Sequence, residues 1–290
     1  MSRLFILILA VLSFTVPAFA YDVLVVQSVR GKNYDAALQG LRSKCNASIN
    51  ILVASDYAEL DLTRVVREDR PKVVVVLGDK ALAAAKKIRK TPVVVLMSLQ
   101  IRNPGVAHSN MTGIDMLVSP ARYVPIFKAL KTKRIGILYN PANTGKYVKQ
   151  STATFKRADI NLEVREMSDP RKTLDMLASL KNKIDAIWVI PDTTAVTLET
   201  AEAYFLFAQE YNVPLVSFSG SHTGFGAIGA LDIDRTELGV QAGELTQAIL
   251  DGASPAEFPF TSPRKAVIKS NHAVLERFGF PPDLLDDLND

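Results

Sequence analysis

Cysteine is almost absent from this sequence, whose 290 residues include only Cys45. An internal disulfide needs two cysteines, so a small fold stapled by disulfides is excluded. Long hydrophobic runs are also scarce. The run from Leu4 to Leu12 is shorter than the roughly 20 residues that a membrane span needs, and no later stretch comes close. We therefore expect no membrane-spanning helix.

Charge of one sign is not in excess either. Lys and Arg total 34 against 30 Asp and Glu, a formal net charge of +4, and the two signs are interspersed. The basic run Lys86 to Lys90 is typical of the solvated end of a helix, and no aromatic platform accompanies it. We therefore expect no nucleic-acid partner. With 48% hydrophobic residues the chain is long enough and apolar enough to bury a large core, which excludes disorder.

Catalytic and metal-binding patterns are lacking as well. His108, His222 and His272 stand apart from one another and from any Cys or Glu at ligand spacing, so we expect no metal site. The stretch Gly220 to Gly224 has His where a nucleophile elbow has Ser. The stretch Gly224 to Gly229 matches the dinucleotide fingerprint, but a strand rather than a helix is expected after it. We expect no cofactor and no enzymatic activity.

The first twenty residues have the form of a secretory signal peptide. Arg3 precedes the apolar run, and Pro17 to Ala20 supplies a small-x-small cleavage signature. Cys45 lies 25 residues beyond Ala20, so a lipid anchor at the cleavage point is not expected. The sequence predicts that residues 1–20 are removed and that the remainder is a periplasmic protein, not a lipoprotein.

From Asp22 onward, short runs rich in Val and Ile alternate with segments of helical period, the pattern of βα units on a parallel sheet. The expected strands fall in two series: 23–26, 49–53, 73–77, 93–97 and 112–114, then 135–139, 162–166, 186–190, 215–218 and 227–231. The first three strands of the second series start 112, 113 and 113 residues after their counterparts. The fold class predicted is α/β, with two Rossmann-like lobes of similar plan, each a parallel sheet flanked by helices.

Helices are expected at 123–130, around Leu198 to Ala208, and at 236–251. In the last of these, Leu238, Ala242, Leu245 and Ile249 share one face, which predicts core packing. Asp234 with Glu237 fits an N-cap and its third-position partner, and Gly252 ends the segment.

Parallel α/β sheets bind ligands beyond the carboxyl ends of their strands, so the candidate site residues follow the expected strands. They are small, polar and rich in hydroxyls, which suits a compact polar or zwitterionic solute. The candidates are Gln27, Ser28, Gly78, Asp79, Lys80, Ser98, Tyr139, Asn140, Asn143, Thr144, Asp192, Thr193, Phe218, Ser219 and Asp234.

Each candidate has a structural alternative. Asp79, Asp192 and Asp234 could be helix N-caps, worth about 1 kcal/mol each. Asp192 is the one for which we favour a binding role. Tyr139 and Phe218, at strand ends, could pack in the core or stack on a ligand.

Several stretches resemble the substrate-binding proteins of ABC transporters, of the type that includes tryptophan- and tyrosine-binding receptors. Together they cover nearly the whole chain after residue 20. The stretches are 77–81, 110–114, 134–141, 185–192, 226–239 and 249–252.

The resemblance implies two hinge-linked lobes that close over a ligand, as in type I periplasmic binding proteins. Lobe 1 would hold 21–117 plus 233–258, and lobe 2 would hold 118–232 plus 259–290. Two departures from the family pattern, Gly78-Asp79 and Asn103-Pro104, bear on which ligand the first lobe accepts.

From the resemblance we expect a monomeric receptor that binds a small solute, such as an amino acid, and presents it to a membrane permease. Asp192 would pair with an ammonium group, Ser28, Ser98 or Thr193 would bind a polar or anionic end, and Tyr139 or Phe218 would cover an apolar part. The alternative is a periplasmic sensor that docks onto a membrane signalling receptor. Both use the same fold and pocket.

Overall fold

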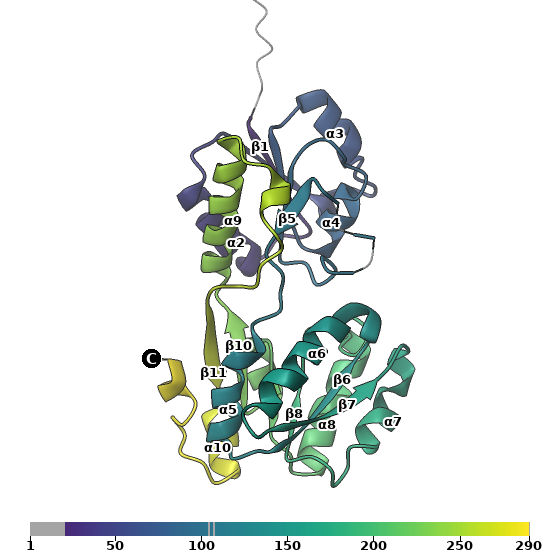
Figure 1. The fold of residues 1–290 in the computed structure, drawn as a ribbon, viewed down its shortest axis with the longest axis vertical. Coiled ribbons are helices and arrows are strands. Elements are labelled where there is room, and N and C mark those ends of the chain that lie inside the picture. The colour runs from purple at the N-terminus through teal and green to yellow at the C-terminus, as the bar shows by residue number, and fades with distance from the viewer. Residues whose placement is uncertain (1–20, 104, 107, 290) are drawn as a thin grey trace, which may run out of the picture.

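In the computed structural model, which describes residues 21–103, 105–106 and 108–289, the chain forms two α/β bodies, one above the other in Figure 1. The predicted signal peptide, residues 1–20, lies outside the described residues. Within the ranges that are described, no helix is long and apolar enough to cross a membrane.

The upper body contains a five-stranded, fully parallel sheet in the order β2-β1-β3-β4-β5. Its strands and helices are β1 (Val23–Gln27), α2 (Lys32–Lys44), β2 (Ile49–Val53), α3 (Leu62–Asp69), β3 (Val73–Leu77), α4 (Asp79–Ala85), β4 (Val93–Leu96) and β5 (Met111–Gly113). Alternate residues of β1 pack to opposite sides: Val23 and Val25 toward α2, Leu24 and Val26 toward α3 and α4. Burial on both faces explains why these strands are continuous apolar runs.

The lower body contains a six-stranded sheet in the order β11-β10-β9-β8-β6-β7, and β11 pairs with its neighbour antiparallel while the other pairs are parallel. Its elements are α5 (Val124–Ala129), β6 (Arg134–Tyr139), α6 (Pro141–Lys156), β7 (Asn161–Glu166), α7 (Thr173–Ala178), β8 (Ala186–Trp188), α8 (Leu198–Glu210), β9 (Leu215–Ser217), β10 (Gly229–Ile233), β11 (Ala266–Ser270) and α10 (His272–Arg277). Strands β6 to β10 repeat the spatial order of β1 to β5. The predicted duplicated plan and fold class are confirmed.

Two strand predictions need correction. The tenth expected strand spans 227–231 but β10 runs from Gly229 to Ile233, because the amide of Ala227 donates to the His222 carbonyl and closes the preceding turn. Strand β11 is absent from the expected series. It is an edge strand of five residues, and only three of them are apolar. The dinucleotide-like stretch Gly224 to Gly229 leads into strand β10, as expected, and not into an α-helix; the turn before it, Gly220–Phe225, is a 3₁₀ helix.

Helix α9 (Arg235–Leu250) follows β10 of the lower sheet but lies in the upper body, beside α2 (Figure 1). The two helices approach closely where both carry glycine. A Cβ on Gly239 would fall on the backbone carbonyl of Ala37, and one on Gly40 would fall on that of Thr236. The pairing depends on the absence of side chains at these positions.

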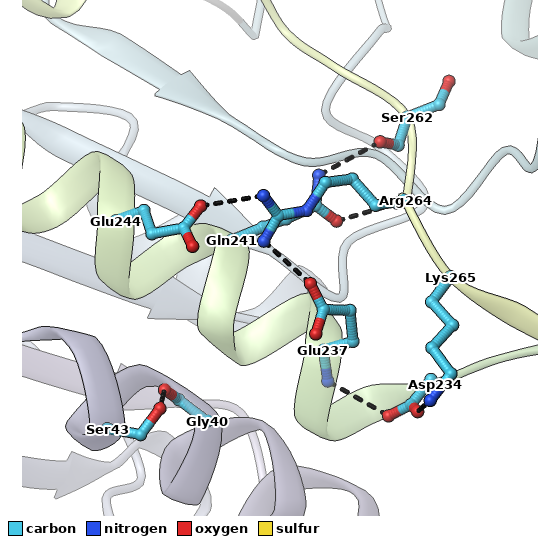
Figure 2. Close-up of polar contacts among 9 residues, drawn as sticks. All are labelled: Gly40, Ser43, Asp234, Glu237, Gln241, Glu244, Ser262, Arg264 and Lys265. Carbon is cyan, nitrogen blue, oxygen red and sulfur yellow. Dashed lines mark hydrogen bonds and ion pairs between the residues drawn. The ribbon is translucent and has the colours of Figure 1, made fainter.

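Three segments, called here the three crossings, connect the bodies: 114–119 after β5, 233–235 between β10 and α9, and 258–265 before β11. The third crossing is fastened to α9 (Figure 2). Arg264 pairs with Glu237 and Glu244 at 2.7 and 2.9 Å, and Lys265 pairs with Asp234 at 3.0 Å. The chain therefore leaves the upper body along α9 and enters the lower sheet at Ala266.

Candidate functional site

The carboxyl ends of the parallel strands of the two sheets face each other (Figure 1). The first crossing leaves the carboxyl end of β5 and the second leaves that of β10, and each leads to the other body. Helix α6 also begins at the carboxyl end of its strand, β6. Since α/β folds bind ligands at this edge of the sheet, a site is expected where the two edges meet.

A hollow of about 600 Å³ lies at this meeting of edges, within the range typical of small-molecule sites. Its walls come from the loop after β4, from the first and third crossings, and from the first turns of α6. Its polar lining residues are Arg102, Asp115, Ser119, Asn143, Thr144, Lys146, Gln150 and Ser262, and the others are Leu117, Pro120, Pro141, Ala142, Gly145 and Tyr147. A narrow continuation reaches Ser98, Leu99 and Pro191.

Arg102 and Asp115 form an ion pair in the wall of the hollow. The Asp115 side chain is 3% exposed and that of Arg102 is 44% exposed, so the guanidinium covers the carboxylate. Asp115 also accepts from the Leu117 amide at 3.0 Å. Burial raises the pKa of Asp115, although the nearby Arg102 opposes this shift.

Asp192 organises the loops on the lower side. It is 1% exposed, and its oxygens accept from the amides of Asn140, Thr194 and Ala195, each at 2.9 Å, and from the Thr144 hydroxyl at 2.6 Å. The carboxylate thus ties the loop after β8 to the start of α6. The predicted contact between Asp192 and a ligand ammonium stays a prediction.

Asn143 extends this network into the hollow. Its side-chain amide donates to the hydroxyls of Thr193 and Thr194, each at 3.0 Å. Asn140 caps α6 by accepting from the Ala142 amide at 3.0 Å. These contacts hold the α6 end of the hollow in place.

A smaller polar network lies on the upper side. Asp79 accepts from the Ser98 hydroxyl and, at 3.2 Å, from the Gln100 amide. Ser28 accepts from the Ala81 amide at 3.0 Å. Gly78, at φ 89°, leaves room for Ser28, because a Cβ on it would lie 2.6 Å from the Ser28 hydroxyl oxygen.

Of the predicted site residues, Ser98, Asn143 and Thr144 line the hollow or its continuation. Asn140, Asp192 and Thr193 lie directly behind that lining, in the hydrogen-bond network of the α6 end. Ser28, Gly78 and Asp79 lie together at the carboxyl ends of β1 and β3, next to Lys80 in the first turn of α4.

The remaining predicted residues have partners of their own. Tyr139 donates to Glu166 at 2.7 Å, and burial together with that carboxylate raises the pKa of Tyr139 to about 12. Phe218 packs against His222, with ring centroids 5.2 Å apart. Ser219 bonds to Ser221.

Two of the predicted residues lie at strand ends. Asp234 is the N-cap of α9, accepting from the Glu237 amide at 3.0 Å. Gln27 is buried at the end of β1, and its Oε1 has no hydrogen-bond partner in the described part of the chain.

Sequence reasoning missed Arg102, Asp115, Tyr147 and Ser262, which line the hollow. Arg102 lies inside a connection of fourteen residues between β4 and β5, where no strand end marks it. The sequence signals that could have found them are the position of Asp115, two residues after β5, and that of Tyr147, one helical turn after Asn143.

One further cluster could hold a metal ion. Ligand atoms of His272, Asp283 and Asp286 lie within 4.8 Å of one another. In this structure His272 Nε2 bonds to Asp286 at 2.8 Å, and Asp286 accepts from Ser270 at 2.6 Å. The group holds the C-terminal segment on the lower body, and none of its three residues is among the described residues that line the hollow.

Comparison with known proteins identifies a family whose model matches this chain. The model of the family described as ABC transporter substrate binding protein matches residues 25–279. A tyrosine-binding protein from Clostridioides difficile strain R20291 is 23% identical over 224 residues, which are 74% of this chain and 64% of that protein. The chain thus spans a little less than two thirds of that relative's length.

Two solved structures share the fold. The ABC domain from Streptococcus pneumonia in complex with L-Trp has a TM-score of 0.63 and 21% identity, over 91% of this chain and 98% of that one. The ligand-free, open form of a substrate-binding protein with adhesive properties from Clostridium difficile has a TM-score of 0.64 and 20% identity, over 89% and 94% of the two chains.

Proposed function

Because the chain belongs to the family of ABC transporter substrate-binding proteins, we propose that it captures a small polar or zwitterionic solute in the hollow between its lobes. An amino acid is among the candidates, since relatives are named for tyrosine binding or hold L-Trp. The protein would work outside the cytoplasm as a monomer and pass its solute to an ABC permease. The family is one of binding proteins rather than enzymes.

The observation that carries this proposal is the composition of the hollow's wall. Arg102 belongs to the upper body, Asp115 and Ser262 to crossings, and Asn143, Thr144 and Tyr147 to α6 of the lower body. A solute bound there contacts groups on both sides of the crossings. A ligand favours closure only by its excess affinity for the closed state, and contacts from both lobes supply that excess.

The proposed lobes are 21–117 plus 233–258 and 118–232 plus 259–290. We place the polar end of the solute against Asn143 and Thr144, which are the predicted site residues that line the hollow itself. Asn140, Asp192 and Thr193 would hold these groups in position.

The test begins with the protein purified after export. Native mass spectrometry identifies what copurifies with it, and thermal shift is measured across amino acids, purines and small organic acids. A ligand at one hundred times its Kd should add about 2.7 kcal/mol of stability. If no compound copurifies and none raises the melting temperature, the proposal is wrong.

Two asparagine variants locate the binding. Asn143→Ala, in the wall of the hollow, should weaken the solute identified by about 5- to 30-fold through loss of a buried hydrogen bond. Asn161→Ala, on the exposed start of β7, is the matched control and should leave affinity unchanged. Loss of uptake of the same solute in a deletion strain would separate transport from sensing.

A further inference from the structure

The charges that line the hollow are unequal. Arg102 and Lys146 are cations, and Asp115 is the single acidic residue among the described lining residues. The Asp115 side chain is 3% exposed, with one oxygen on Arg102 Nε and the other on the Leu117 amide. A ligand entering the hollow therefore meets positive charge.

The side chain of Arg102 is fixed in an orientation that leaves some of its N–H donors without a partner among the described residues. Its Nε donates to Asp115 and its Nη2 donates to the Phe260 carbonyl at 3.3 Å, while Nη1 has no partner in the part of the chain that the structure describes. Guanidinium carries five N–H donors in a planar fork that matches a carboxylate. Because Asp115 and Phe260 belong to the first and third crossings, the fork is fixed where the two bodies join.

The opposite wall of the hollow also contributes positive charge. The first turns of α6, a helix of sixteen residues, line the hollow, and the N-terminal end of a helix carries partial positive charge. Lys146 lies in this stretch and makes no ion pair with any described residue.

A cationic end of a ligand has no equivalent partner. Asp192 is 1% exposed and is engaged by amides and a hydroxyl of the chain itself. Asp79 is engaged by Ser98 and by the Gln100 amide. No carboxylate among the described lining residues is left for an ammonium group.

We infer that the hollow selects its solute by a carboxylate, which Arg102 receives, while the body of the solute lies against Leu117, Pro120 and Tyr147. This inference rests on the proposed function and names the substrate class of that site. An organic acid without an ammonium group then binds at least as tightly as the amino acid with the same body.

The test uses two series of probes that differ only in their charged ends. The phenol series is L-tyrosine, 3-(4-hydroxyphenyl)propanoate and tyramine, and the indole series is L-tryptophan, indole-3-propanoate and tryptamine. Affinity is measured by calorimetry on the protein purified after export. In at least one series the acid should match or exceed the amino acid, and the amine should bind at least tenfold more weakly.

Variants of Arg102 test whether its guanidinium is the group that binds the carboxylate. Arg102→Gln should weaken the acid by about 10- to 100-fold, since a charged hydrogen bond is lost, and should not weaken the amine. Arg102→Lys should recover part of the affinity, because the charge remains and the fork is lost. Arg134→Gln is the matched control: Arg134 is 48% exposed and paired with Asp185, but it lies at the start of β6, away from the hollow, and should change nothing.

The inference is overturned, while the proposed function stands, if the amines bind as tightly as the acids. It is also overturned if a folded Arg102→Gln or Arg102→Lys variant keeps its affinity for the acid as fully as Arg134→Gln does. Binding of none of the acids and amino acids overturns it as well. The proposed function stands or falls separately, on whether any small molecule copurifies with the protein or raises its melting temperature.

Discussion

At the scale of single residues, the site depends on side chains that are occupied by the chain itself. Asp192 is the clearest case. Its buried carboxylate accepts hydrogen bonds from four donors, which stabilise the charge, and these bonds fix the positions of the loops that carry the donors. Asn143 and Thr144 line the hollow, and each is held there by its own hydrogen bond, to Thr193 and to Asp192 respectively.

Asp192→Ala should destabilise the fold by about 2–4 kcal/mol, because it leaves buried donors without an acceptor. Urea denaturation measures the loss. Asp169→Ala is the control, since Asp169 also accepts a backbone amide, from Arg171, but at the surface, and it should cost clearly less than Asp192→Ala. Equal losses would contradict the organising role of Asp192.

Two histidines should give stability opposite dependences on pH. Burial lowers the pKa of His222, so the unfolded chain binds its proton more readily and stability falls as pH drops below about 6.5. Asp286 raises the pKa of His272, so its contribution is present below about 6.5 and is lost as pH rises through the folded pKa.

Unfolding free energies at pH 5 and pH 8 measure both effects. Relative to the parent protein, His222→Asn should lose less stability on acidification and His272→Asn should lose more. Identical pH profiles for the two variants would show that neither environment perturbs its histidine as described.

At the scale of elements, the contact of α2 with α9 depends on glycine. Helix α9 returns to the upper body because its face of Leu238, Ala242 and Ile249 packs with the core beneath the first sheet. The close approach of the two backbones then leaves no space for a Cβ on Gly239.

Gly239→Ala should therefore destabilise the protein by about 1–3 kcal/mol, since the added Cβ meets the backbone of α2, which cannot move aside cheaply. Gly145→Ala is the matched change within another helix, α6, where the nearest atom to a Cβ is 3.7 Å away. It should stabilise by about 0.5–1 kcal/mol. Thermal and urea denaturation measure both, and two changes of the same sign would refute this account of the helix pair.

At the scale of the whole molecule, the three crossings are fastened to one another where they join the two bodies. The second and third crossings are joined by a hydrogen bond from the Asp234 amide to the Lys265 carbonyl, and Arg264 fixes the third to α9 (Figure 2). The first crossing is tied to the third where Asp115 donates its amide to Thr261. The joined crossings favour one common bend over independent movements of each segment.

Saturation with a bound solute should reduce the radius of gyration, because contacts to both bodies favour the closed arrangement. Small-angle scattering measures the change, and an analogue that fails to raise the melting temperature is the control. If a ligand raises the melting temperature but leaves the radius of gyration unchanged, binding does not bring the two bodies together.

The class of the fold and most of its elements follow from local patterns in the sequence. Buried parallel strands must be continuous apolar runs, and amphipathic helices must repeat their apolar positions, so the residues alone predict the strand at 73–77 and the helix at 236–251. The duplicated order of strands follows from the matched spacing of such runs. Edge strand β11 escapes this reasoning because a strand covered on one side needs fewer apolar residues.

The composition of the site, in contrast, arises from tertiary packing. Strand ends point to the correct edge of each sheet, which is why Ser98, Asn143 and Thr144 are among the candidates. Which of these groups line the hollow depends on crossings that bring Arg102, Asp115 and Ser262 together from distant parts of the chain. Contacts of that kind follow from the packing of two bodies, and no local pattern of residues encodes them.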